Sequence, residues 1–259
     1  MKICSLGSGS KGNCFYISES QTGILVDAGL PVRKLKERLA HAGLSLNAIS
    51  AILFTHDHGD HYQGVMGLLR ECPALPLYAT EGTAEGIERA FQRASWAWRI
   101  FERKTPFEIG PLTITPFPVP HNAADPVGFI VAAHERRLGL ATDLGCLPPL
   151  LREALAECHA LVLESNYDTD MLMMSGRPWS VKTRIAGLRG HLSNDDAATC
   201  IRAMQSTVLQ TLLLAHISEE CNTTYTAHHG MAEALRECGL GDITLSCFLQ
   251  NEPSCMYEV

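Results

Sequence analysis

Three histidines and two aspartates stand within one six-residue string of the sequence. The string HDHGDH occupies residues 56–61, one residue after an apolar run at 52–54. Imidazole nitrogens and carboxylate oxygens both bind divalent metals, and this spacing sends His56 and His58 to one position and Asp60 and His61 to a neighbouring one. A solvated polar loop would not account for three imidazoles at one strand end. The string therefore predicts a metal site that could serve two ions.

Further candidate ligands follow three later apolar runs. His121 comes after the run 112–117, Asp143 after the run 138–141, and His216 after the run 212–215. Each position alone is a weak signal, because a lone histidine is more often structural. Functional groups are commonly presented where strands pass into loops, and one string cannot fill two coordination spheres. We therefore expect these three residues to join the string at one site.

The surrounding sequence alternates short apolar runs with amphipathic stretches. Strands are expected at 14–17, 24–26, 52–54, 112–114, 128–131, 138–141, 161–163, 212–215 and 243–245, and helices at 31–42, 61–71, 83–94, 148–157, 194–205 and 227–238. This alternation predicts a mixed α/β class. No linker or low-complexity tract interrupts it, so a single domain over residues 1–259 is expected.

Composition sets limits on location and partners. The chain has 259 residues and a formal net charge of −7, which argues against a surface coated in basic charge for nucleic acid. No signal peptide is visible, and no apolar run approaches the roughly 20 residues of a membrane span. A cytoplasmic protein without a membrane partner is therefore expected. Ten cysteines without a CxxC pair predict reduced, mostly buried thiols and no thiolate zinc site.

The glycine-rich start of the chain fits GxGxxG at residues 7–12. A dinucleotide-binding loop needs a helix after this pattern, but the residues that follow, 14–18, have strand character. Asn13 also stands where a phosphate-binding loop of the Walker A type has lysine. A hairpin is the expected structure, although its backbone N–H groups could still meet an anion.

The order of these motifs resembles that of the metallo-β-lactamase-fold hydrolases over nearly the whole chain. The resemblance implies an αββα four-layer sandwich with two metals at one edge of its sheets. It also implies ligand sets, which are His56, His58 and His121 for the first metal, Asp60, His61 and His216 for the second, and Asp143 between them. Asp27, in the string LVDAG, would hold the HDHGDH loop by hydrogen bonds without touching metal.

Two histidines late in the sequence are candidates for the remaining roles of metal ligand and catalytic residue. His191 lies in GHLSN at 190–194 and His216 in AHIS at 215–218. This pairing resembles the phosphodiesterase branch of the superfamily, in which the earlier histidine acts on the phosphate and the later one binds metal. His191 and Asp60 are accordingly expected to be catalytic, and His216 to be a ligand.

Several strings further resemble the YycJ (WalJ)-type bacterial proteins. They are SGSKGN at 8–13, THDHGDH at 55–61, PHNAADP at 120–126, ATDLG at 141–145, LESNYD at 163–168 and GHLSN at 190–194. This resemblance implies a metal-dependent exonuclease that acts on DNA from the 5′ end.

The chemistry expected of such a site is phosphodiester hydrolysis. Two divalent ions can lower the pKa of a bridging water, hold a phosphate oxygen and neutralise charge on phosphorus. Asp60 would orient the resulting hydroxide, and His191 would stabilise the phosphorane or pass a proton to the departing oxygen. The imidazole and carboxylate ligands suit zinc best, and they also allow manganese or iron.

Other functions stay open at this point. A glyoxalase II-type thioesterase shares the HxHxDH string but has little use for His191, and a lactonase or lactamase would lack that second histidine. A metal-binding module without activity would be expected to have lost ligands. RNA processing competes with DNA degradation, but only 47 residues separate Asp143 from His191, which leaves no room for a long arm or an inserted nuclease domain.

Substrate contacts are expected from a basic segment beside the site. The segment contains Arg177, Lys182, Arg184 and Arg189 and could equally be a solvated loop; Ser10 and Asn166 are weaker candidates. Two divalent ions would add about four positive charges at the site. The net charge of −7 is therefore compatible with a small, local grip on the phosphates of a nucleic acid, with DNA preferred over RNA.

Overall fold

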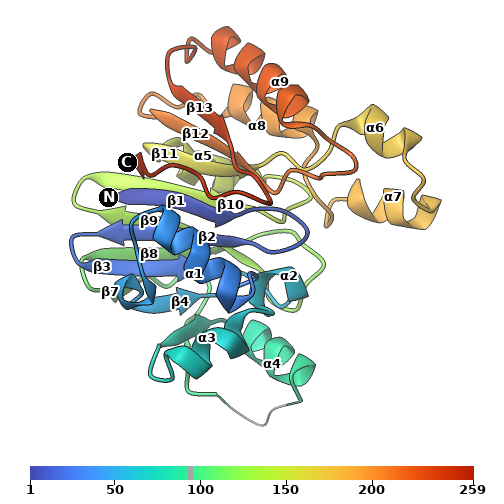
Figure 1. Ribbon diagram of the computed structural model, residues 1–259. Coiled ribbons are helices and arrows are strands. Elements are labelled where there is room, and N and C mark those ends of the chain that lie inside the picture. Colours follow the sequence, from blue (N-terminus) through green and yellow to red (C-terminus); the bar gives the residue numbers. More distant parts are fainter. Residues whose placement is uncertain (93–95) are drawn as a thin grey trace.

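The computed structural model describes residues 1–92 and 96–259, and this part of the chain forms two seven-stranded sheets (Figure 1). The first sheet has the order β14 (Tyr257–Glu258), β1 (Lys2–Gly7), β2 (Cys14–Glu19), β3 (Thr22–Val26), β4 (Ala51–Leu53), β5 (Leu77–Ala79), β6 (Trp98–Ile100). The second has the order β13 (Thr244–Cys247), β12 (Thr211–Ala215), β11 (Ala160–Glu164), β10 (Arg136–Ala141), β9 (Val127–Ala133), β8 (Leu112–Pro118), β7 (Phe107–Ile109).

Helices cover the outer face of each sheet. The first sheet packs against α1 (Val32–His41), α3 (Val65–Glu71) and α4 (Glu81–Ala90), next to the short η1 (Leu46–Ala48). The second packs against α5 (Pro149–Ala156), α8 (Asn194–Met204) and α9 (Thr224–Glu237). With the two sheets in contact through a third apolar cluster, the predicted αββα architecture is confirmed.

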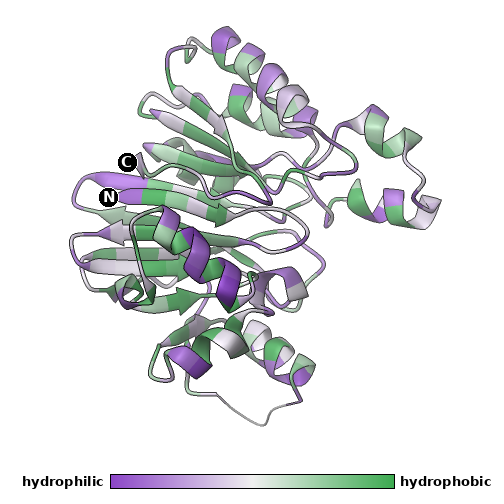
Figure 2. Ribbon diagram, viewed as in Figure 1, coloured by the Kyte–Doolittle hydropathy of each residue, from purple (hydrophilic) through white to green (hydrophobic). Residues whose placement is uncertain are grey.

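The central strands are buried on both faces, which is why they read as continuous apolar runs. In β12, Leu212 and Leu214 pack toward the outer helices, while Leu213 and Ala215 pack between the sheets. Full burial of one such leucine stabilises the fold by about 1.5–3 kcal/mol. Figure 2 shows hydrophobic residues running through the strands of both sheets and hydrophilic residues on the outer turns of α1 and α9.

The glycine-rich start forms a hairpin, as predicted. β1 and β2 pair antiparallel, with a shift in register near Gly7, and β2 follows the loop where a nucleotide-binding fold would have a helix. Asn13 ties this loop together, because its side-chain oxygen accepts a hydrogen bond from the backbone N–H of Gly9 at 2.8 Å.

The helix expected at 61–71 is in fact two helices, α2 (Gly59–Tyr62) and α3. The break falls at Gly64, whose N–H donates to the carbonyl of Ala28 at 2.9 Å. A Cβ at Gly64 would lie 1.9 Å from the carbonyl oxygen of Leu30, so only glycine allows the two chain segments to approach this closely. Of the helix expected at 83–94, residues 93 and 94 lie outside the described part of the chain, and α4 ends at Ala90.

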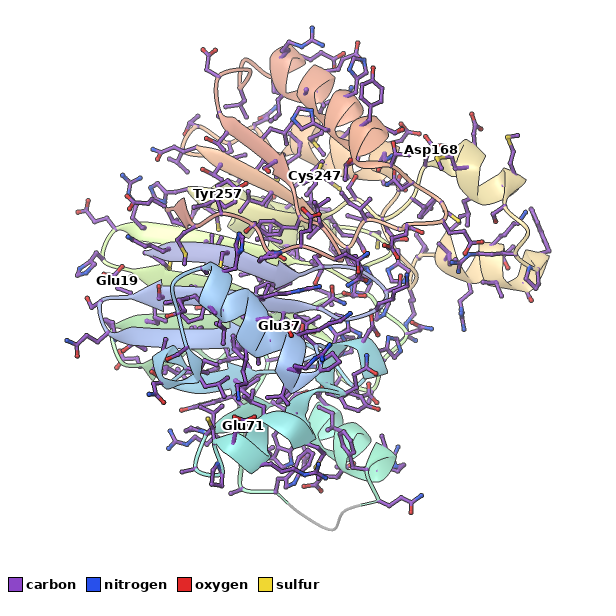
Figure 3. The ribbon with its side chains drawn as sticks, viewed as in Figure 1. Glu19, Glu37, Glu71, Asp168, Cys247 and Tyr257 are labelled. Atoms are coloured by element: carbon purple, nitrogen blue, oxygen red, sulfur yellow. The ribbon has the colours of Figure 1, made fainter. Side chains whose placement is uncertain are left out.

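Several short elements escaped the sequence analysis. The strands β1, β5, β6, β7 and β14 were not predicted, and neither were α6 (Thr169–Met174) and α7 (Trp179–Ile185). These two helices form an arm that projects from the body (Figure 1). Asp168, labelled at the base of the arm in Figure 3, caps α6 by accepting a hydrogen bond from the backbone N–H of Met171 at 2.9 Å. Among the residues described, no helix has both the length and the apolar character to cross a bilayer.

Candidate metal centre

Strand direction brings the predicted ligands to one edge of the molecule. β3 to β6 run parallel in the first sheet, and β10 to β13 run parallel in the second. His56 follows the carboxyl end of β4, Asp143 that of β10, and His216 that of β12. The two sheets meet at this edge, since Nε2 of His61 lies 3.4 Å from Oδ2 of Asp143.

The backbone is strained at three residues of this edge. Asp27, Asp143 and His216 have φ values of 64°, 57° and 55°, in the left-handed region that non-glycine residues rarely adopt. Each comes directly or nearly directly after a strand, so the chain turns sharply where it leaves the sheet. Such conformations cost about 1–3 kcal/mol each and are typical of functional sites, where the position of the side chain matters more than stability.

The side chains gather in overlapping groups whose possible ligand atoms lie within 4.8 Å of one another. One group is His56, His58 and His121, and a second is Asp60, His61 and His216. Asp143 belongs to further groups that include His56 and His61 on one side and His191 and His216 on the other. The structure therefore brings together all seven predicted ligands; two of the groups match the sets that the family resemblance implied, and a further group adds Glu164 and His191.

Three buried polar atoms in this cluster fit a bound metal. Nε2 of His56, Oδ2 of Asp143 and Nε2 of His216 have no hydrogen-bond partner among the residues that the structure describes. A buried polar group left without a partner costs about 1–3 kcal/mol, so native structures rarely keep one without a function. Imidazole nitrogens and a carboxylate oxygen are donors that divalent metals accept. The residues present therefore fit divalent ions.

The imidazoles fall into two electrostatic groups. Burial, reinforced by neighbouring imidazoles, lowers the pKa of His56 well below its ordinary value, and burial also lowers the pKa of His121. Burial acts in the same direction on His61 and His216, but nearby carboxylates, Asp143 foremost, outweigh it and raise the pKa of both. Negative charge is thus concentrated beside His61 and His216, which favours a cation there.

Asp27 fixes the position of the HDHGDH loop through hydrogen bonds. Its carboxylate accepts hydrogen bonds from the backbone N–H of Thr55 at 2.9 Å and from the Thr55 hydroxyl, and it lies 2.8 Å from Nδ1 of His61. Burial raises the pKa of Asp27, although His61 opposes this effect. Because Nδ1 of His61 faces Asp27, its Nε2 is the atom directed toward Asp60 and Asp143.

Glu164 is the functional candidate that the sequence analysis missed. Its Oε1 lies 2.8 Å from Nδ1 of both His191 and His216, and its Oε2 accepts hydrogen bonds from the backbone N–H groups of Leu144 and Leu192. Burial alone would raise the pKa of Glu164, but the two histidines outweigh it and lower the pKa. Its position at the end of β11 matches the strand-end rule that had identified Asp143, so the signal was present.

The glycine-rich hairpin loop also reaches the site. The side-chain amide of Asn13 lies 3.2 Å from Oδ2 of Asp60, and the Ser8 hydroxyl accepts a hydrogen bond from the backbone N–H of His216 at 2.8 Å. Neither residue was predicted to contact the site. The hairpin thus supports the loop after β4 and the strand end after β12 at once.

His191 faces open space beside the cluster. Its side chain is 22% exposed, and it lines a cavity of about 230 Å³ together with His58, Asn122 and Arg184. The Nδ1 atom is held by Glu164. This leaves the other ring nitrogen available to a substrate in that cavity.

The predicted substrate contacts lie at different depths. Arg184 and Ser10 are exposed, while the buried Asn166 donates to the carbonyl of His216 at 2.7 Å. Lys182 is buried, and its ammonium donates to the carbonyl of Met173 at 2.5 Å. The amphipathic stem packs within the arm, so this cation stabilises the arm and points away from solvent.

Comparison with known proteins agrees with this fold. Residues 22–217 match the family model of the β-lactamase superfamily domain, and the chain therefore belongs to this superfamily. The Zn²⁺-bound PqqB from Methylobacterium extorquens, 17% identical, covers 100% of both chains with a TM-score of 0.75, which supports the shared fold.

Within the superfamily, two curated relatives identify the family of hydrolases to which the chain is similar in sequence. The chain is 34% identical to the exodeoxyribonuclease YycJ of Bacillus anthracis over 240 residues, 91% of this chain and 89% of the relative. It is 32% identical to the exodeoxyribonuclease WalJ of Streptococcus pneumoniae over 243 residues, 93% and 90% of the two chains. The protein is thus a metal-dependent hydrolase of the family that includes these two exonucleases.

Proposed function

We propose that this protein is a phosphodiesterase with two divalent metal ions that degrades DNA as an exonuclease from the 5′ end. The observation that carries the proposal is the Glu164–His191 pair beside the seven clustered ligands. A thioesterase or lactonase needs the metal ligands but not a histidine that is held by a buried carboxylate and faces a cleft. The exodeoxyribonuclease relatives support DNA as the substrate.

The ligand groups divide between two ions. His56, His58 and His121 would hold one ion, and Asp60, His61 and His216 the other, with Asp143 between them. Zinc suits this set of imidazoles and carboxylates best. When bound, such ions activate water and neutralise the charge that gathers on a phosphate during hydrolysis.

Side chains of the protein would then orient the attacking water and donate a proton to the substrate. Asp60 keeps its charge, because His61 and His216 lower its pKa despite its burial, and the carboxylate can orient the attacking water. Glu164 fixes the ring of His191 through Nδ1, so that the other nitrogen can donate to a phosphate oxygen or to the departing sugar oxygen. Arg184 and Ser10 lie where they can contact the substrate.

The test compares substrates of different classes on metal-loaded protein. End-labelled duplex DNA, single-stranded DNA, a tRNA precursor, bis(p-nitrophenyl) phosphate and a glutathione thioester are each incubated with the enzyme. We expect DNA to be shortened from its 5′ end, and the thioester to remain intact. Cleavage confined to the thioester would overturn the proposal, and faster cleavage of the tRNA precursor than of either DNA would assign the enzyme to RNA.

A further inference from the structure

Three cavities with shared wall residues follow one another, starting beside the candidate metal centre. The cavity of about 230 Å³ at His58 and a cavity of about 110 Å³ share Arg184 and His191 in their walls. That second cavity shares Ser10, Arg177 and Ser218 with a third of about 340 Å³. We call this path, from His58 to Lys11, the strand groove.

The strand groove carries three cations in series. Arg184 is the nearest to His191 and is exposed, with no ion pair among the residues that the structure describes. Arg177 comes next and donates from two N–H groups to the same oxygen, Oε2 of Glu220, at 2.6 and 3.1 Å. Lys11 is the most distant and lies 2.5 Å from Oε2 of Glu219.

The partners of the two outer cations are weakly held. The side chains of the Lys11–Glu219 pair are 71% and 45% exposed, and those of the Arg177–Glu220 pair are 32% and 53% exposed. Exposed ion pairs contribute only about 0.2–1 kcal/mol. A phosphate can therefore replace either carboxylate at small cost, and arginine binds phosphate with two parallel hydrogen bonds.

The remaining walls suit the same ligand. Ser10, Ser218 and Asn166 line the small middle cavity; the Asn166 amide donates to the His216 carbonyl, so the two serines are the polar groups offered to a ligand. Hydroxyl and amide groups, like arginine, are common contacts to phosphate and sugar oxygens and carry no base specificity. A series of cations with hydroxyls between them is the arrangement expected for a polyanionic chain.

We propose that the strand groove binds the phosphodiester backbone next to the cleaved bond. Arg184 binds the nearest phosphate, and Arg177 and Lys11 bind those beyond it after exchanging Glu220 and Glu219 for phosphate. This inference rests on the proposed function, and it adds the path of the substrate and the role of two glutamates as competitors of DNA. It also explains how a chain with a net charge of −7 can hold a nucleic acid locally.

The experiment measures binding separately from cleavage. A fluorescent single-stranded DNA with phosphorothioate linkages, which resists hydrolysis, is titrated with the metal-loaded protein at several salt concentrations. Arg184→Ala, Arg177→Ala and Lys11→Ala are each expected to weaken binding severalfold and to reduce the slope of log K against log salt by about 0.7. Glu220→Gln is expected to tighten binding, because it frees Arg177.

Matched variants provide the controls. The Arg202–Glu237 pair is of the same kind and is similarly exposed, but it joins α8 to α9 outside the groove, and Lys36–Glu71 matches the lysine pair. Arg202→Ala, Lys36→Ala and Glu237→Gln are expected to bind DNA like the parent protein. Circular dichroism checks that every variant is folded.

The outcomes separate the two proposals. If the enzyme cleaves DNA but Arg177→Ala and Lys11→Ala bind it as tightly as Arg202→Ala and Lys36→Ala, the strand groove is wrong and the proposed function stands. Unchanged or weaker binding by Glu220→Gln likewise overturns the exchange of ion pairs. If no phosphodiester is cleaved at all, the proposed function fails, and this inference fails with it.

Discussion

At the scale of single residues, the site is a set of histidines whose orientation is fixed by carboxylates. Asp27 faces Nδ1 of His61, and Glu164 faces Nδ1 of His191 and His216. In each case one ring nitrogen is occupied and the other is left for a metal or a substrate. Such supporting partners orient ligands and increase their basicity, and they matter nearly as much as the ligands themselves.

Glu164→Gln tests this support. The amide keeps the shape but removes the charge that faces two histidines, so we expect DNA cleavage to fall by about 10–100-fold. Turnover on DNA and metal content per chain are measured for the variant. Glu157→Gln is the control, because Glu157 is 67% exposed and pairs with Arg137 at the far end of β10. Equal activity in the two variants would remove Glu164 from the functional site.

His191 and His216 are expected to respond differently to truncation. His216→Ala should lower the metal content, because its buried Nε2 is one of the atoms without a partner among the described residues. His191→Ala should keep the metal and lower the cleavage rate by about 10²–10⁴-fold, the usual contribution of an acid or base. Elemental analysis measures the metal content of both variants, and kinetic assays measure their cleavage rates. A halved metal content in His191→Ala with normal content in His216→Ala would exchange the two roles.

At the scale of elements, close backbone contacts place the ligand loops. The N–H of Asn13 donates to the carbonyl of Asp60 at 2.8 Å, and the N–H of Gly29 donates to the carbonyl of Asn13 at 2.9 Å. The hairpin loop, the turn after β3 and α2 are thus joined by backbone hydrogen bonds. Gly29 lies at the centre of this junction, where a Cβ would come within 1.7 Å of the carbonyl oxygen of Asp60.

Gly29→Ala is therefore expected to destabilise the protein and to displace Asp60. Overpacking of this kind costs about 1–3 kcal/mol or more, because backbone atoms must move. Gly230→Ala is the matched control. Gly230 lies within α9 with open space around its Cβ position, and the change should stabilise the protein by about 0.5–1 kcal/mol. Urea unfolding measures both; equal stability of the two variants would contradict the close contact.

At the scale of the whole molecule, the candidate metal ligands come from both sheets. These candidate ligands follow strand ends of both sheets, and three of their buried polar atoms lack hydrogen-bond partners among the described residues. Ions that bind only the native state therefore stabilise the entire fold. The same argument links metal loading to folding, since the unfolded chain has no assembled site.

Removal of metal is expected to lower the melting temperature. Protein treated with a chelator and then dialysed should unfold at a lower temperature than the metal-loaded protein, and added Zn²⁺ should restore the difference in a concentration-dependent way. Differential scanning calorimetry on both forms gives the comparison. Identical melting temperatures would show that the cluster does not bind metal in the native state.

All ten cysteines lie within the described residues as free thiols, and five of them are buried, fewer than the majority that the sequence analysis expected. Burial raises the pKa of Cys158 to about 12 and that of Cys4 to about 12. The thiolate is the reactive form, so iodoacetamide at pH 8 should label the exposed Cys238 and Cys255 first. Cys4 and Cys158 should be labelled only after unfolding. Mass spectrometry of the labelled peptides provides the measurement. Labelling of Cys158 as fast as Cys238 would contradict the packing described.

The sequence by itself predicted nine of the strands and a set of candidate metal ligands that the fold brings together. Apolar periodicity depends on neighbouring residues, and the HDHGDH string carries its ligand types at adjacent positions, so both signals are local. Buried strand ends also pointed to Asp143 and His216. Several short strands and the helices of the arm were missed, because segments of two to seven residues carry too little periodicity to recognise.

Only the tertiary structure decided which groups support the ligands and which cations are free. Glu164 meets His216 across 52 residues of sequence, and Lys11 meets Glu219 across 208. In the basic segment, the Lys182 side chain is buried, Arg177 forms an ion pair with Glu220, and Arg184 is exposed. Burial and pairing depend on what the folded chain brings alongside each residue. The physical reason is that the charge and hydrogen bonds of a side chain are set by neighbours in space, which a linear pattern does not contain.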